Sequence, residues 1–178
     1  YGATVVSEKG LAQGGIAGYV KDVDAAKGNE RVGDKPLIVK LTPNCASPAD
    51  VAAAAEEHGA DAVSLINTLR GMAIHPDRPG EPWLGGGTGG VSGPAVRAIA
   101  LSQVREVRGR LGLPSVGMGG VQSGRHADDL RRAGADLVAV GTESFRDPLA
   151  AQRSAREMST PADVFPANEA RGIEVVRL

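Results

Sequence analysis

The sequence has few aromatic residues and only one cysteine. Phe, Trp and Tyr make up 3% of its 178 residues, so its core must be built from aliphatic side chains. Such side chains suit parallel strands that are covered by helices on both faces. The single cysteine, Cys45, excludes an internal disulfide and a multi-cysteine metal site, and it fits a reducing compartment. We therefore expect a cytoplasmic α/β protein that binds no metal.

The chain also lacks an excess of either charge and any long apolar run. It carries 20 basic and 21 acidic residues, a net charge of −1, so no global field favours nucleic acid or an anionic membrane. No apolar run approaches the roughly 18–20 residues that cross a bilayer, and the first residues do not resemble a signal peptide. We expect neither nucleic acid nor a membrane as a partner. Because the chain opens on Tyr1 rather than Met, we expect a fragment.

What the sequence does contain is an alternation of short apolar runs with segments of helical period. We predict strands at Thr4–Val6, Leu37–Leu41, Ala62–Ile66, Ser115–Met118 and Leu137–Val140. Helices are predicted at Ile16–Ala26, 48–58, Pro94–Leu111, 123–132 and Pro148–Met158. This order implies a parallel sheet with right-handed crossovers. Three strands follow a similar Gly-Ala step, at Gly2, Gly59 and Gly134, which indicates a repeated joint between helix and strand.

The strand count leaves two architectures open. About five strands are predicted, whereas a closed (β/α)8 TIM barrel needs eight strands and about 250 residues. Either the chain is part of a barrel or it forms an open α/β sheet. We favour a partial barrel over residues 1–158, followed by a polar carboxyl-terminal tail at 159–178 that includes a candidate strand at Ile173–Val176.

Polar or glycine residues stand at or just after four of the predicted strands. They are Lys40, Asn67-Thr68, Gly119-Gly120 and Gly141-Thr142. The carboxyl ends of parallel strands form the active face of such folds. Glycines at this place let backbone N–H groups approach a phosphate, and two such turns on adjacent strands are typical of a barrel phosphate site. The alternative is a pair of ordinary turns.

Three further features allow two interpretations each. Lys40, inside an apolar strand, needs an internal carboxylate or an electron-rich ligand such as a reduced flavin. Asn67 and Thr68 could hydrogen-bond a planar ring or belong to a simple turn. The glycine-rich segment Gly85–Pro94 could cover a ligand or merely connect two elements. The three histidines have no metal-ligand spacing.

Five runs resemble, in their order along the chain, those of class 1 dihydroorotate dehydrogenases, especially the NAD-linked 1B branch. They are Lys35–Asn44 (KPLIVKLTPN), Ile66–Leu69 (INTL), Thr88–Ala95 (TGGVSGPA), Gly117–Val121 (GMGGV) and Ala139–Thr142 (AVGT). The resemblance extends from about Lys35 to Met158 and indicates the carboxyl-terminal half of the family's FMN-binding barrel.

The resemblance implies a set of site residues and a reaction. The residues implied to contact FMN are Lys40, Ile66, Gly93, Gly119, Gly120, Gly141 and Thr142. Those implied to hold dihydroorotate or orotate are Asn67, Thr68 and Asn44. The reaction would be oxidation of dihydroorotate to orotate in pyrimidine (UMP) biosynthesis, in which a base removes the C5 proton and a hydride passes from C6 to flavin N5. The 1B branch implies an electron-transfer subunit with FAD and an iron–sulfur cluster, and class 1 implies a homo-oligomer.

The sequence departs from the family pattern at the catalytic base. The family's cysteine belongs to a run just before the matched region, where this chain has Val5–Gly14 without a cysteine, so the catalytic residue is unknown. Glu8 is near that place, and nothing beyond its position supports it as a base. We therefore expect weak or no turnover by this chain alone. The alternatives are another FMN-barrel oxidoreductase and a non-catalytic phosphate-binding remnant.

Overall fold

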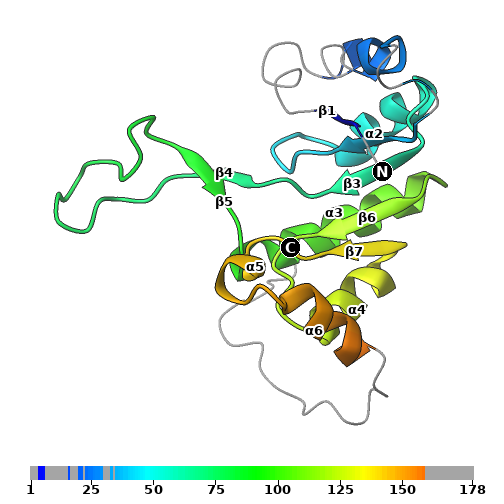
Figure 1. Ribbon diagram of the computed structural model, residues 1–178. Coiled ribbons are helices and arrows are strands. Elements are labelled where there is room, and N and C mark those ends of the chain that lie inside the picture. Colours follow the sequence, from blue (N-terminus) through cyan, green and yellow to red (C-terminus); the bar gives the residue numbers. More distant parts are fainter. Residues whose placement is uncertain are drawn as a thin grey trace.

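The computed structural model describes residues 4–6, 16, 20, 21, 23–29, 33 and 35–158 (Figure 1). They contain a five-stranded parallel sheet with the order β1-β2-β3-β6-β7. The strands are β1 (Thr4–Val6), β2 (Leu37–Lys40), β3 (Ala62–Leu65), β6 (Ser115–Met118) and β7 (Leu137–Ala139). All five strand predictions are confirmed to within one residue. Within the described residues the sheet stays open and no closed barrel forms.

The helices connect the strands and pack against one another in sequence. They are α2 (Pro48–Glu57), α3 (Arg97–Arg110), α4 (Gly124–Ala133), α5 (Glu143–Arg146) and α6 (Ala150–Met158). Helix α2 packs on α3, α3 on α4, and α4 on α6. The described residues between 16 and 27 are also helical. Ser47 and Ser123 cap α2 and α4 by accepting backbone N–H bonds, which satisfies donors that a helix start leaves free.

Some boundaries differ from the predictions. The predicted helix Pro94–Leu111 opens with the 3-10 turn η1 (Pro94–Val96), because Pro94 follows Gly93 in a tight turn and α3 begins only at Arg97. The predicted last helix begins at Ala150 rather than Pro148, and the short helix α5 before it was not predicted. The tail at 159–178, with its candidate strand, lies outside the described residues.

The core lies between the sheet and the helices and is aliphatic, as the composition predicts. Its largest fully buried side chains are Leu37, Leu41, Leu65, Leu130, Val23, Val39, Val63 and Val104. Strands β2 and β6 alternate buried and half-buried residues, so one face of each packs against the helices. The half-buried positions include Lys40 and Met118, the last residues of these two strands.

Two copies of the predicted Gly-Ala joint fall within the described residues, and they have the same geometry. Gly59 and Gly134 leave α2 and α4 with φ of 85° and 124°, which a residue with a Cβ rarely adopts. In both joints the following alanine N–H donates to a carbonyl of the preceding helix, at 2.9 and 3.0 Å. The third copy, at Gly2, lies outside the described residues.

Each joint ends in an aspartate that fixes the start of the neighbouring strand. Asp61 Oδ2 accepts the Leu37 N–H at 2.7 Å, and Asp136 Oδ2 accepts the Ser115 N–H at 2.8 Å. The backbone N–H groups of the same aspartates donate to the carbonyls of Leu37 and Ser115. The aspartate therefore pairs the first residue of one strand with the residue just before the next strand, and this sets the register of the sheet.

Acidification is expected to reduce the difference in stability between the wild type and an Asp61→Asn variant. Hydrogen bonds from the Leu37 N–H and from Lys27 hold the pKa of Asp61 below its ordinary value. A depressed carboxylate pKa adds stability above the ordinary aspartate value of about 3.9, and that stability is lost as the pH falls through the folded-state pKa. The wild type should have the higher urea midpoint at pH 7, and the difference should narrow between pH 5 and 3. A difference that stays constant over this range would contradict the role given to Asp61. Asp77→Asn, at an exposed position away from the sheet, is the control.

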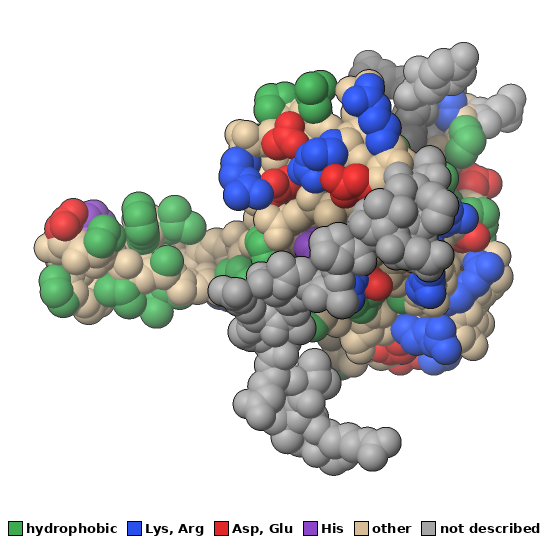
Figure 2. Space-filling view, turned by 90° about the horizontal axis from the view of Figure 1, so that it is seen from below, with side chains coloured by type: hydrophobic (Ala, Val, Ile, Leu, Met, Phe, Trp, Pro, Cys, Tyr) green, Lys and Arg blue, Asp and Glu red, His purple; other side chains and the backbone are tan. Residues whose placement is uncertain are grey.

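A β-hairpin projects from the sheet and includes part of the glycine-rich segment, in which no strand was predicted. Strands β4 (Leu69–Gly71) and β5 (Gly89–Val91) are antiparallel and carry a long connection that extends away from the body (Figure 1). The sequence did not reveal the hairpin, because glycines carry no side chain and therefore hide the alternation of a strand. Gly90 is also closely packed, since a Cβ there would lie 2.3 Å from Thr68 Oγ1. We call residues 69–91 the arm. Its exposed apolar side chains are Met72, Ile74, Trp83 and Leu84, and Figure 2 shows hydrophobic side chains along it.

Every helix among the described residues is too short or too polar to cross a bilayer.

Candidate functional site

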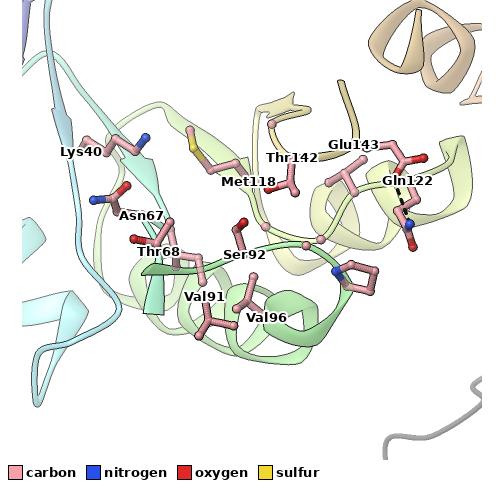
Figure 3. Close-up of a pocket in the computed structure, with 17 residues that line it drawn as sticks. Lys40, Asn67, Thr68, Val91, Ser92, Val96, Met118, Gln122, Thr142 and Glu143 are labelled. Atoms are coloured by element: carbon pink, nitrogen blue, oxygen red, sulfur yellow. Dashed lines mark hydrogen bonds between the residues drawn. The ribbon is translucent and has the colours of Figure 1, made fainter. Parts of the chain in front are cut away.

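A cavity lies at the carboxyl ends of β2, β3, β6 and β7 (Figure 3). It is lined by Lys40, Ile66, Asn67, Thr68, Val91, Ser92, Gly93, Pro94, Val96, Met118, Gly119, Gly120, Val121, Gln122, Gly141, Thr142 and Glu143. Nine of the ten site residues predicted from the sequence belong to this set, and Asn44 does not. The sheet places them together because parallel neighbouring strands end at the same edge.

The two glycine turns reach the same cavity from β6 and β7, but their glycines serve different purposes. Gly119 and Gly120 have φ of 137° and 68°, and a Cβ on either would press on α3, at 2.7 Å from Ala100 Cβ and 2.8 Å from Arg97 Cβ. These two glycines therefore let the turn pack against α3. A Cβ on Gly141 would meet open space. Only at Gly141 does the missing side chain leave room that a ligand could use.

The cavity has two chemically distinct ends. Lys40, Asn67 and Thr68 lie together at one end, and Gln122 and Glu143 lie at the other (Figure 3). Lys40 is the one cationic side chain and Glu143 the one anionic side chain among the described lining residues. The middle is bordered by the hydroxyls of Ser92 and Thr142, by the thioether of Met118 and by glycine backbone. An elongated ligand with a polar ring at the end that holds Lys40, Asn67 and Thr68 fits the shape of this cavity.

Asn44, predicted at the substrate, instead connects the segment after β2 to the segment after β3. Its Nδ2 donates to Thr42 Oγ1 at 2.9 Å and to the Thr68 carbonyl at 3.0 Å. Its Oδ1 accepts the Arg70 N–H at 2.7 Å. The side chain thus fixes the backbone on both sides of Leu69. In this structure Asn44 positions Thr68, and through it one end of the cavity, without lining the cavity itself.

Replacing Asn44 with Ala is expected to loosen this end of the cavity while leaving the sheet intact. Three side-chain hydrogen bonds are lost, which should lower the free energy of unfolding by about 1–2 kcal/mol at this exposed position. Hydrogen exchange should accelerate at the Arg70 amide, which donates to Asn44, and stay unchanged in β6. An Asn44→Asp variant keeps the acceptor for the Arg70 N–H and should show a smaller effect. Unchanged exchange at the Arg70 amide in Asn44→Ala would show that this side chain does not hold the segment.

Sequence reasoning missed several lining residues. Gln122 and Glu143 follow the two glycine turns, and Met118 and Ser92 directly precede Gly119 and Gly93. Their closeness in sequence to the predicted glycines was the one available signal. It was insufficient because a residue next to a turn can point in either direction, and only the three-dimensional backbone decides which.

Two titratable groups with a shifted pKa, His126 and Cys45, do not line the cavity. The Gln122 N–H donates to His126 Nδ1 at 3.3 Å, and Arg97 contacts the other ring nitrogen. Burial, and then the charge of Arg97, lowers the pKa of His126. Burial raises the pKa of the Cys45 thiol, whose Sγ lies 3.3 Å from the Thr42 carbonyl oxygen, so Cys45 is not an activated nucleophile.

The described part of the chain contains no cluster of metal ligands and does not include the candidate base. Glu8, with the rest of residues 7–14, lies outside the described residues. Among the described residues, no three His, Cys, Asp or Glu side chains gather in an arrangement that could hold a metal ion.

Comparison with known proteins identifies the family. The model of the family described as dihydroorotate dehydrogenase matches residues 5–160. The chain is 47% identical over 157 residues to the dihydroorotate dehydrogenase B (NAD(+)) catalytic subunit of Geobacter sp. strain M21, covering 86% of this chain and 51% of that protein. It is 38% identical over 180 residues to the protein of the same name from Oceanobacillus iheyensis, covering 96% and 59%. It is also 46% identical over 136 residues to a putative dihydroorotate dehydrogenase A (fumarate) of Solibacter usitatus, covering 76% and 43%.

The chain therefore belongs to the dihydroorotate dehydrogenase family, whose fold is the TIM barrel. It spans about half the length of the curated relatives it matches. The five parallel strands described here agree with a part of such a barrel.

Proposed function

We propose that this chain contributes the flavin-binding half of a site that oxidises dihydroorotate to orotate in the cytoplasmic biosynthesis of pyrimidines. One observation carries the proposal: the turns at Gly119-Gly120 and Gly141-Thr142, which come from adjacent strands, line the same cavity as Lys40. That arrangement is typical of a barrel phosphate site, and the lysine lies at the opposite end of the cavity.

The residues present suit FMN. Backbone at Gly119, Gly120 and Gly141, with the Thr142 hydroxyl, would hold the phosphate, because the open space beside Gly141 admits an anion to backbone donors. Ile66 and Gly93 would border the flavin, and Lys40 would lie beside its ring. When bound, the flavin would supply the hydride acceptor that no side chain provides. The protein's own contribution is to orient and to enclose.

The end of the cavity that holds Lys40, Asn67 and Thr68, which we call the ring end, suits a small planar substrate. Asn67 offers an amide and Thr68 a hydroxyl, which together can match the carbonyl and N–H edges of a pyrimidine. Asn44 holds the Thr68 backbone in place through the bonds described above. We propose that these three residues select dihydroorotate, with Asn44 acting indirectly.

Association with other chains is part of the proposal. The relatives' name "catalytic subunit" supports a further subunit, for which we propose the FAD and iron–sulfur electron carrier that the 1B resemblance implies. The exposed Met72, Ile74, Trp83 and Leu84 of the arm support self-association, because a projecting apolar ribbon is poorly suited to water. Sedimentation of the purified chain over a range of concentrations tests self-association.

Flavin absorbance and its reduction test the proposed function. The purified chain, mixed with FMN and freed of excess, should retain a yellow flavin spectrum, which a remnant without a cofactor would not. Anaerobic dihydroorotate should bleach that spectrum faster than NADH does, whereas another FMN-barrel reductase would respond preferentially to NADH. Turnover by this chain alone should be weak, since no base is found among the described residues. Absence of bound flavin would reject the proposal.

A further inference from the structure

The residue after the second glycine turn places a negative charge in the cavity. Glu143 is the first residue of α5 and is 8% exposed. It lines the same cavity as Gly120 and Gly141. No other acidic side chain is found among the described lining residues. An anionic cofactor held by the two glycine turns would therefore share its enclosure with a carboxylate.

The carboxylate of Glu143 bridges the two turns. Gln122 Nε2, from the segment that follows Gly119-Gly120, donates to Glu143 Oε2 at 2.9 Å (Figure 3). Arg146 Nε donates to the other oxygen, Oε1, at 3.1 Å. These two hydrogen bonds hold the pKa of Glu143 below its ordinary value, so the group carries its charge at neutral pH.

The compensating positive charge faces solvent. The Arg146 side chain is 75% exposed, whereas that of Glu143 is 7% exposed. Water and salt screen the guanidinium more strongly than they screen the carboxylate. A ligand in the cavity would therefore experience a net negative charge from this pair. Arg153 lies near and donates to the Gln122 carbonyl at 3.0 Å, and two further carboxylates engage it, Asp147 and Glu157.

We propose that Glu143 is a specificity-determining residue that weakens the binding of the phosphate of FMN while it ties the two glycine turns together. The inference rests on the proposed function, since it assumes that this cavity takes FMN. The Glu143 side chain then has two effects. Its hydrogen bonds shape the end of the cavity that would take the phosphate, and its charge repels the phosphate dianion of FMN. The consequence is selective, because riboflavin has the same ring system and no phosphate.

The charge can be removed while most of the shape is kept. A Glu143→Gln variant retains an oxygen that can accept from Gln122 or Arg146. Its FMN dissociation constant should fall by about three- to tenfold, as expected when one unit charge several ångströms from a dianion is removed in a partly solvated site. The riboflavin dissociation constant should not change. Arg146→Gln, which leaves the carboxylate less compensated, should weaken FMN binding by about two- to fivefold on the same reasoning.

Isothermal titration calorimetry of each variant with FMN and with riboflavin measures the two dissociation constants. Glu57→Gln, at an exposed position of α2, is the matched control. Tighter FMN binding with unchanged riboflavin binding in Glu143→Gln supports the proposal. If the wild type binds FMN and Glu143→Gln binds it equally or more weakly, the proposal is wrong. If Glu143→Gln does not fold, Arg146→Gln decides, and unchanged FMN affinity there overturns the proposal. If the wild type binds no FMN, the proposed function itself fails, and this inference with it.

Discussion

A Gly120→Ala variant is expected to lose about 2–5 kcal/mol of unfolding free energy and to bind no flavin at accessible concentrations. The backbone of Gly120 has φ of 68°, which costs an alanine free energy. Its Cβ would also lie 2.8 Å from Arg97 Cβ and 2.9 Å from the Gly93 carbonyl oxygen. Because Gly93 and Gly120 line the same cavity, a shift that relieves this clash must displace the cavity wall. Urea denaturation measures the first effect and FMN titration the second.

Two other glycines serve as controls for this prediction. Gly109 lies in α3 with open space beside it, so Gly109→Ala should raise stability by about 0.5–1 kcal/mol. Gly141 has no neighbour that a Cβ would meet, so Gly141→Ala should leave the urea midpoint unchanged and weaken FMN binding alone. If Gly120→Ala were as stable as the wild type, the close packing of this turn on α3 would not be needed for the fold.

Replacing Lys40 with Met is expected to shift the midpoint potential of bound FMN by about 30–60 mV toward more negative values. Lys40 ends β2 at the ring end of the cavity and is the cationic side chain of the described lining. A cation beside a reduced flavin stabilises the negative charge that develops near N1. A charge-assisted interaction contributes roughly 1.5–3 kcal/mol, and 30 mV corresponds to about 1.4 kcal/mol for a two-electron couple.

The charge of Lys40 can be separated from its bulk. Lys40→Arg keeps a cation and should shift the potential less than Lys40→Met does. Lys27→Met removes a lysine that pairs with Asp61 at the surface and should leave the potential unchanged. Spectroscopic titration against a reference dye gives all three values. A potential that is the same in Lys40→Met and the wild type would remove Lys40 from the ring end of the site.

The strands and their joints could be predicted from the sequence because local signals and tertiary packing agree there. Apolar runs mark β2 and β6, serines cap α2 and α4, and the Gly-Ala step at Gly59 and Gly134 recurs with one geometry. The arm could not be predicted in the same way. Its strands are short, and three of their residues are glycines, which carry no side chain to alternate.

The candidate site was predictable as a set of strand ends but not as a set of side-chain orientations. The glycine turns and Lys40 stand where the parallel order requires them to meet. Asn44 also follows a strand end, four residues after Lys40, yet its side chain turns to Thr68 and Arg70. Glu143 follows a predicted turn, and only the path of α5 shows that its carboxylate joins Gln122. Such choices depend on contacts between segments distant in sequence.

A crystal structure of the chain with bound FMN tests the central claim most directly. We predict one flavin, with its phosphate held by backbone N–H groups of both the Gly119-Gly120 and the Gly141-Thr142 turns and its ring beside Lys40. A phosphate bound by one turn alone, or a flavin seated elsewhere on the molecule, would contradict it.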